Sequence, residues 1–294
     1  MNNKGSVSKK NYRKICAIIV IAEIISCITL PALASTRSNE TTYTNTTVNS
    51  AGYYHNSKEE VSDKYSELYN KNVAIIGDSI STYEGYIPEG YKHFYSKSNV
   101  DSVEKTWWGQ LVNKTGVNVV SNCSWSGSTV TGDSTSNTNA YAACSDKRIN
   151  DLSLSNENID IVICYIGIND YRRNVAVGHW SAEDEVPTDS TKVSTFSEGY
   201  ALMVSKIKNK YPNAKVYVTT LMKCDDTNNK ATYSLDGYNE AIRQAADKFD
   251  AEIVDLNQFM IEKNDFVDYS LDRLHPNASG HEMMSTLFAE TLLN

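Results

Sequence analysis

Cysteine is scarce in this chain, which has six among its 294 residues, two of them within the first 34. The four others are too few to staple a domain of this size, so a disulfide scaffold is excluded. Cys164 lies in an apolar run and is expected to be a small buried hydrophobic residue. Cys123 and Cys144 flank a polar stretch, and the sequence leaves open whether they form a disulfide.

Positive charge and cofactor motifs are also in short supply. The chain has 28 Lys and Arg against 36 Asp and Glu, a formal net charge of −8. An acidic surface repels phosphate backbones and anionic membranes, so we expect no nucleic-acid partner, and neutral substrates or cationic partners are favoured. No cluster has metal-ligand spacing and no glycine-rich phosphate loop occurs, so we expect no metal and no other cofactor.

The apolar run from Ile15 to Leu30 follows five basic residues and precedes a small-x-small cleavage signal that ends at Ala34. We therefore expect residues 1–34 to be a secretory signal peptide and the mature protein to be extracellular. Its removal leaves 23 basic and 35 acidic residues, a formal net charge of −12. Glu23 inside the run argues against a stable membrane span. An uncleaved anchor and a lipoprotein attached through Cys27 are the alternatives.

A polar stretch separates this segment from the rest of the chain. Residues 35–60 are rich in Ser, Thr and Asn, with too few large apolar side chains to order themselves. We expect residues 35–70 to be a linker and lead-in, and residues 71–294 to form one domain.

Five apolar runs of strand length recur in that domain, at Val73–Ile76, Val117–Val120, Ile159–Ile166, Val216–Leu221 and Ile253–Leu256. They are continuous rather than alternating, which is typical of parallel strands that are covered on both faces. Apolar residues at helical spacing lie between them and after the last of them. The pattern predicts a three-layer α/β sandwich around a parallel five-stranded sheet.

In such folds the ligand sits beyond the carboxyl ends of the strands. Three predicted strand ends carry polar residues there: Gly77–Ser79, Ser121–Gly127 and Gly167–Asp170. Topology therefore predicts that these segments are neighbours, and that Ser79 lies at the edge of the sheet.

A serine needs a base to become a nucleophile, and the base needs a third group to orient it. In "LDRLHPNASG", Asp272 and His275 are three residues apart, so one turn could supply both acid and base. Pro276 then ends that turn. His281 has no evident orienting partner and is expected to lie on the surface of the last helix.

Acyl transfer also needs donors for the tetrahedral oxyanion. The candidates are the backbone N–H groups of Ser79 and Gly127 and the side-chain amide of Asn169. Gly127 and Asn169 could instead be ordinary turn residues. The candidate substrate-binding residues are Trp125, Asp78 and Asp170.

Four segments in this order resemble the four blocks of the SGNH (GDSL) hydrolase superfamily across nearly all of residues 72–294. They are "GDSIS" with Ser79, the segment with Gly127, "GIND" with Asn169, and "DRLH" with His275. The first block differs from the fuller "GDSL" pattern only in having Ile80 in place of Leu. In the second block, Ser124 stands where many relatives carry another glycine.

The resemblance implies a flavodoxin-like α/β/α fold and ester hydrolysis through an acyl-enzyme. By position, Ser79 would be the nucleophile, His275 the general base and Asp272 its orienting acid. The N–H groups of Ser79 and Gly127, with Asn169, would form the oxyanion hole.

Export, an acidic surface and this residue set together favour an extracellular serine esterase. We expect it to remove acetyl or other short acyl groups from a small-molecule or polysaccharide ester. A lipase or thioesterase of the same superfamily and a non-catalytic glycan-binding protein are the alternatives. Acyl transfer to a sugar instead of water also stays open.

Overall fold

The structure, a computed structural model, describes Tyr54 and residues 61–131, 142–181, 183–225, 231–258 and 265–294. The predicted signal peptide and most of the predicted linker lie outside the described residues. Across the described ranges, every helix is too short or too polar to serve as a membrane span. Cys123 and Cys144 are free, buried thiols, so the disulfide left open above does not form. Cys164 is fully buried, as expected.

A parallel five-stranded sheet occupies the centre of the domain. Its strands lie in the order β2-β1-β3-β4-β5, and every neighbouring pair is parallel. This confirms the predicted sheet, with the strand order of flavodoxin-like folds. The strands are β1 (Asn72–Gly77), β2 (Asn118–Asn122), β3 (Ile161–Tyr165), β4 (Lys215–Thr219) and β5 (Glu252–Val254). The predicted runs locate all five, with ends that differ by a few residues.

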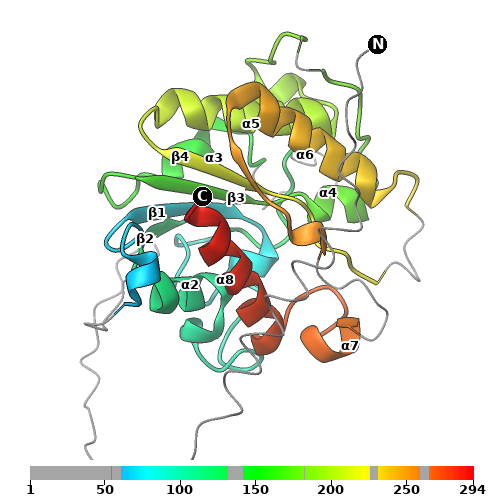
Figure 1. The fold of residues 1–294 in the computed structure, drawn as a ribbon. Coiled ribbons are helices and arrows are strands. Elements are labelled where there is room, and N and C mark those ends of the chain that lie inside the picture. The colour runs from blue at the N-terminus through cyan, green and yellow to red at the C-terminus, as the bar shows by residue number, and fades with distance from the viewer. Residues whose placement is uncertain (1–53, 55–60, 132–141, 182, 226–230, 259–264) are drawn as a thin grey trace, which may run out of the picture. The chain divides into compact units, whose positions relative to one another are not determined.

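Helices cover both faces of the sheet, as expected for strands without a polar face (Figure 1). Helices α2 (Trp107–Thr115) and α8 (Ala278–Leu292) pack together on one face. Helices α5 (Phe196–Lys210) and α6 (Leu235–Phe249) pack together on the other, with α3 (Asp146–Asp151) against α5. The short helices are α4 (Ile168–Arg172) and α7 (Asp265–Tyr269). Together these layers form the predicted three-layer sandwich.

The core below α2 is joined directly to the turn that follows β1. The Trp107 ring stacks on Phe288 of α8, with centroids 4.2 Å apart. The Trp107 indole N–H donates to the Ser81 hydroxyl at 3.1 Å, and the Trp108 indole N–H donates to the Ser81 carbonyl at 3.0 Å. Buried tryptophans place their N–H groups on such partners to avoid losing a hydrogen bond. The hydrophobic core therefore fixes the backbone two residues beyond Ser79.

Part of the predicted lead-in packs onto the domain. Tyr54 and Val119 of β2 exchange two backbone hydrogen bonds of 2.8 Å, and Leu68 is buried in the core. A short 3₁₀ helix, η1 (Asp63–Tyr65), lies between Tyr54 and Leu68 in the sequence. The lead-in thus contributes to the edge of the sheet at β2.

Candidate active site

The predicted site residues follow the carboxyl ends of neighbouring strands. Ser79 begins the 3₁₀ helix η2 (Ser79–Ser81) directly after β1, Gly127 lies in the loop after β2, and Asn169 lies in α4 after β3. His275 lies in the turn between α7 and α8. Because β2, β1 and β3 are adjacent and parallel, the first three residues share one edge of the sheet.

A hydrogen-bonded chain joins Ser79, His275 and Asp272. The Ser79 Oγ lies 2.9 Å from the His275 Nε2, although the residues are 196 positions apart. The His275 Nδ1 lies 2.8 Å from an Asp272 carboxylate oxygen. A carboxylate accepts from Nδ1–H and leaves Nε2 free of a proton, so the Nε2 can accept from the serine hydroxyl. This arrangement can deprotonate Ser79.

The Asp272 carboxylate also shapes the turn that carries His275. Its second oxygen accepts from the backbone N–H of His275 at 2.8 Å and of Leu274 at 3.1 Å. Burial by itself would raise the pKa of Asp272, but the donated hydrogen bonds and the His275 charge outweigh it and lower the pKa to about 2. Asp272 is therefore a carboxylate at neutral pH.

One residue of this turn has an unfavourable backbone conformation. Arg273 has a φ of 67°, in the left-handed region that glycine favours. Its N–H donates to the Ser270 hydroxyl at 2.8 Å, and its carbonyl accepts from the Asp225 N–H at 3.0 Å. Its guanidinium also pairs with the Asp225 carboxylate at 2.5 Å. These contacts offset the strain that the Asp272–His275 turn requires.

Each predicted oxyanion donor has an N–H hydrogen that is not donated to a described protein acceptor. Within the described residues, the backbone N–H groups of Ser79 and Gly127 donate to no acceptor. Gly127 has a φ of 81°, and its carbonyl accepts from the Arg173 guanidinium at 2.8 Å. The Asn169 amide donates one hydrogen to the Ser128 carbonyl at 3.0 Å, which leaves its second hydrogen. Donors without a protein acceptor, beside a serine–histidine pair, are what an oxyanion hole requires.

A family model described as GDSL-like lipase/acylhydrolase matches residues 71–289. The chain belongs to this family. It is a serine hydrolase of the SGNH type, and the resemblance seen in the sequence is confirmed.

Two similar solved structures agree with the fold of this GDSL-like hydrolase. One, titled a GDSL-like lipase from Bacteroides uniformis, has 22% identity and a TM-score of 0.58, over 76% of this chain and 95% of that one. The other, with the same title and from Bacteroides ovatus, has 22% identity and a TM-score of 0.57, over 76% and 98%. The comparison with curated proteins gave no match.

Two carboxylates of the GDSL-like hydrolase that the sequence offered for substrate binding are fully buried. Asp170 accepts from the Val130 N–H at 2.9 Å and from the Thr131 hydroxyl at 3.2 Å. Asp78 accepts from the Ile80 N–H at 3.1 Å. The prediction that they contact substrate is wrong, because each carboxylate is turned inward onto backbone donors. They shape the two loops that carry Gly127 and Ser79.

Burial also changes how these two carboxylates titrate. Desolvation, together with the smaller effect of the Asp170 charge, raises the pKa of Asp78 to about 7, although backbone donors and Arg148 act to lower it. Desolvation likewise raises the pKa of Asp170 to about 6, although four hydrogen bonds oppose it. Two acids of near-neutral pKa thus lie directly behind the Ser79 turn.

The Gly77 carbonyl, just before Asp78, accepts three hydrogen bonds, two from the loop after β2 and one from α3. It accepts from the Trp125 N–H at 3.1 Å, the buried Arg148 guanidinium at 2.9 Å and the Ser128 hydroxyl at 3.4 Å. A Cβ at Gly77 would lie 2.7 Å from the Ser124 hydroxyl, so only glycine fits beside this serine. The Ser124 departure from the family pattern is therefore accommodated by packing against Gly77.

Trp125 lies mostly beneath the surface, with 5% of it exposed. Its ring packs on Tyr91 with centroids 4.1 Å apart. Tyr91 lies in the loop that follows the Ser79 turn. Trp125 therefore supports the wall of the site from behind. Its predicted contact with substrate stays a prediction.

His281 does not lie on the surface as expected. It is fully buried in α8, with its ring edge-on to Tyr95 at 4.7 Å. Burial, and then the charge of His275, lower the pKa of His281 to about 3, so it is neutral. The signal for this was present in the sequence, because His281 shares a helix face with Met284 and Phe288.

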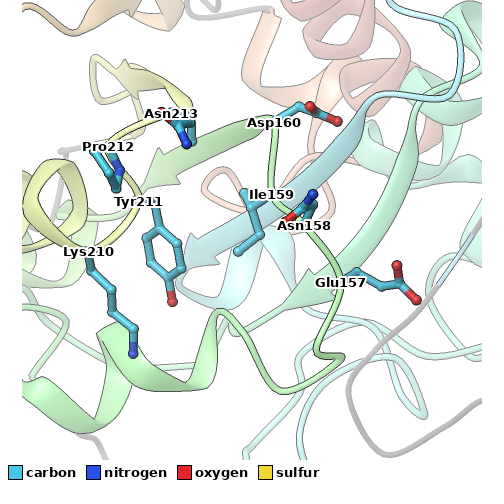
Figure 2. A pocket seen from close by; sticks show the side chains of 9 residues that line it. Glu157, Asn158, Ile159, Asp160, Lys210, Tyr211, Pro212 and Asn213 are labelled. Carbon is cyan, nitrogen blue, oxygen red and sulfur yellow. The ribbon is translucent and has the colours of Figure 1, made fainter.

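A cavity of about 330 Å³ lies elsewhere on the GDSL-like hydrolase (Figure 2). It is lined by residues that precede β3 and β4, among them Asp160, Tyr211 and Ala214. These lie at the amino ends of the strands, whereas the Ser79 site lies beyond the carboxyl ends. None of the predicted site residues lines this cavity.

Replacement of Asp78 by Asn should change how stability depends on pH. Because the folded protein raises the pKa of Asp78 from 3.8 to about 7, the stability linked to this proton is complete below pH 3.8 and is lost as pH rises toward 7. The free energy of unfolding of Asp78→Asn, relative to wild type, should therefore increase between about pH 4 and pH 8, by up to about 4 kcal/mol. Urea denaturation at both pH values measures this difference.

Asp247→Asn is the matched control, because Asp247 is exposed on α6. Its difference from wild type should be the same at both pH values. An equally flat difference for Asp78→Asn would contradict the raised pKa.

Proposed function

We propose that this protein is an extracellular esterase that removes acetyl or other short acyl groups from carbohydrates through an acyl-enzyme. Ser79 is the nucleophile, His275 the general base and Asp272 the group that orients the base. The single observation that supports this most strongly is the 2.9 Å and 2.8 Å relay from Ser79 through His275 to Asp272.

The relay suggests the order of proton movements. As the Ser79 Oγ attacks the ester carbonyl carbon, its proton moves to the His275 Nε2, and the carbonyl oxygen becomes an oxyanion. The N–H groups of Ser79 and Gly127 and the Asn169 amide donate to that oxygen. His275 then gives its proton to the departing alcohol oxygen, which leaves Ser79 acylated. Water, deprotonated by His275, hydrolyses this ester and restores the serine.

The burial of the relay supports a short acyl group. Only 4% of Ser79 and 9% of His275 is exposed, so the reacting atoms lie below the surface. Phe94 covers one face of the His275 ring. The two Bacteroides proteins are described as GDSL-like lipases, so preference for longer acyl chains is the competing outcome.

The carbohydrate and extracellular parts of the proposal are supported by the sequence. The predicted signal peptide exports the chain to where polysaccharides occur, and the net negative charge disfavours anionic lipid surfaces. A neutral acetylated sugar is not repelled by the negative charge of the protein, and polysaccharides that carry such sugars occur outside the cell.

The preference for short acyl groups is tested by measuring the hydrolysis of p-nitrophenyl esters of increasing acyl chain length by purified residues 35–294. We expect kcat/KM to be highest for acetate and to fall for long chains, because the reacting atoms are buried. Ser79→Ala should lower kcat by roughly 10³-fold or more, since the nucleophile is lost. Preference for long chains would overturn the short-acyl proposal, and full activity of Ser79→Ala would overturn the catalytic one.

The role of Asp272 is tested by Asp272→Asn. The amide would hold the imidazole in the tautomer that has its proton on Nε2, so kcat should fall by as much as roughly 10⁴-fold while the thermal unfolding midpoint changes little. Asp268→Asn, at the neighbouring α7, is the control and should retain activity. A kcat near that of wild type for Asp272→Asn would remove Asp272 from the mechanism.

Export is tested by expressing the full chain in a bacterial host and sequencing the N-terminus of the secreted protein. The mature chain should begin at Ser35, because cleavage follows Ala34. Ala34→Arg should block cleavage and serves as the control. A mature chain that still carries residues 1–34, or one that begins with a lipid-modified Cys27, would contradict the proposed processing.

A further inference from the structure

The His275 imidazole has an aromatic ring packed flat against one of its faces. The Phe94 and His275 ring centroids lie 3.5 Å apart, and the ring planes differ by only 11°. The two hydrogen bonds of the imidazole, to Ser79 and Asp272, lie in the ring plane. Phe94 therefore contacts one of the two ring faces that the hydrogen bonds of the relay leave unconstrained.

Phe94 is held in place from the Ser79 turn. Its backbone N–H donates to the Thr82 hydroxyl at 2.8 Å, and that hydroxyl donates to the Ser79 carbonyl at 2.8 Å. The Phe94 carbonyl accepts from the Asn99 side chain at 3.0 Å. The ring that covers the base is thereby attached to the backbone of the nucleophile.

The next residue makes the matching contact on the histidine side. The Tyr95 hydroxyl donates to the Pro276 carbonyl at 2.8 Å, directly after His275. The Tyr95 ring also meets the imidazole edge-on, with centroids 6.3 Å apart and planes at 82°. Phe94 and Tyr95 together therefore bridge the Ser79 turn and the His275 turn.

We propose that Phe94 is a positioning residue that fixes the plane of the His275 imidazole relative to Ser79. If the imidazole rotates about its χ2 bond, both in-plane hydrogen bonds lose their alignment, and a flat ring at 3.5 Å opposes that rotation. The ring also keeps water from one face of the base. This proposal rests on the roles of Ser79 and His275 in the proposed function.

The shape of the side chain distinguishes positioning from mere bulk. Phe94→Leu keeps an apolar side chain but replaces the flat surface with a branched one, whereas Phe94→Tyr keeps the ring. Phe249→Leu is the matched control, since Phe249 is also half-buried and stacked, on Trp180 at 6.2 Å, at the far end of α6.

The experiment measures kcat and KM for p-nitrophenyl acetate, and the rate at which a fluorophosphonate labels Ser79. For Phe94→Leu we expect kcat and the labelling rate to fall together, by roughly 10- to 100-fold, with KM within about twofold of wild type. Phe94→Tyr should stay within about threefold of wild type in all three measurements. Phe249→Leu should leave kcat and labelling unchanged. Thermal unfolding midpoints verify that each variant is folded.

A wild-type labelling rate in Phe94→Leu would overturn the proposal, and so would equal losses in Phe94→Leu and Phe94→Tyr. The proposed function fails differently. If the fluorophosphonate labels Ser79→Ala as fast as wild type, the catalytic assignment is wrong. If wild type is labelled but does not cleave acetate, only the substrate is wrong, and the labelling rates still test Phe94.

Discussion

The hydrogen bond between the Ser79 Oγ and the His275 Nε2 is the constraint on which the site depends. It joins two residues that are 196 positions apart in the sequence. The fold of the chain between them must therefore bring the Ser79 Oγ and the His275 Nε2 to within 2.9 Å of each other. The core reaches the serine through the Trp107 and Trp108 contacts with Ser81. It reaches the histidine through α8, whose N-cap Asn277 follows Pro276 and accepts from the Gly280 N–H at 3.0 Å.

Three fully buried ionisable groups lie in the loops and helix around the site, and their burial costs stability. Asp78 and Asp170 are fully buried and are kept on backbone donors of the loops around Ser79 and Gly127. Arg148 is equally buried, and desolvation lowers its pKa, although nearby acidic groups raise it. Removing a charge from water is costly unless hydrogen bonds replace the lost hydration. The protein thus orders its catalytic loops with groups that would otherwise destabilise the fold.

Much of the architecture could be predicted from the sequence because its signals are local. Continuous apolar runs locate all five strands, and helical spacing locates α2, α5, α6 and α8. The spacing of Asp272 and His275 predicts a shared turn, and the strand ends predict that Ser79, Gly127 and Asn169 share an edge of the sheet. His281 is buried instead of exposed because its helical spacing with Met284 and Phe288 puts it on the core-facing side of α8, and the lack of an orienting partner does not indicate exposure.

Other parts of the site have no local signal. Phe94 meets His275, Arg173 meets Gly127 and Asp225 meets Arg273 only through the tertiary fold, and no local sequence pattern indicates these pairs. Asp78 and Asp170 lie beside catalytic groups in the sequence, but backbone direction turns their side chains inward. The positions of Asp78 and Asp170 in the sequence predict that they lie near the site, but not which way their side chains point.

If Ser79, His275 and the three donors form an acyl-transfer site, a serine-reactive probe must bind there in a defined orientation. We expect a crystal structure of the protein after reaction with an acyl-phosphonate to show phosphorus bonded to the Ser79 Oγ, with one phosphonyl oxygen accepting from the Ser79 and Gly127 N–H groups and the Asn169 amide. Phosphorus on another residue, or a phosphonyl oxygen turned away from all three donors, would contradict the assignment of an acyl-transfer site.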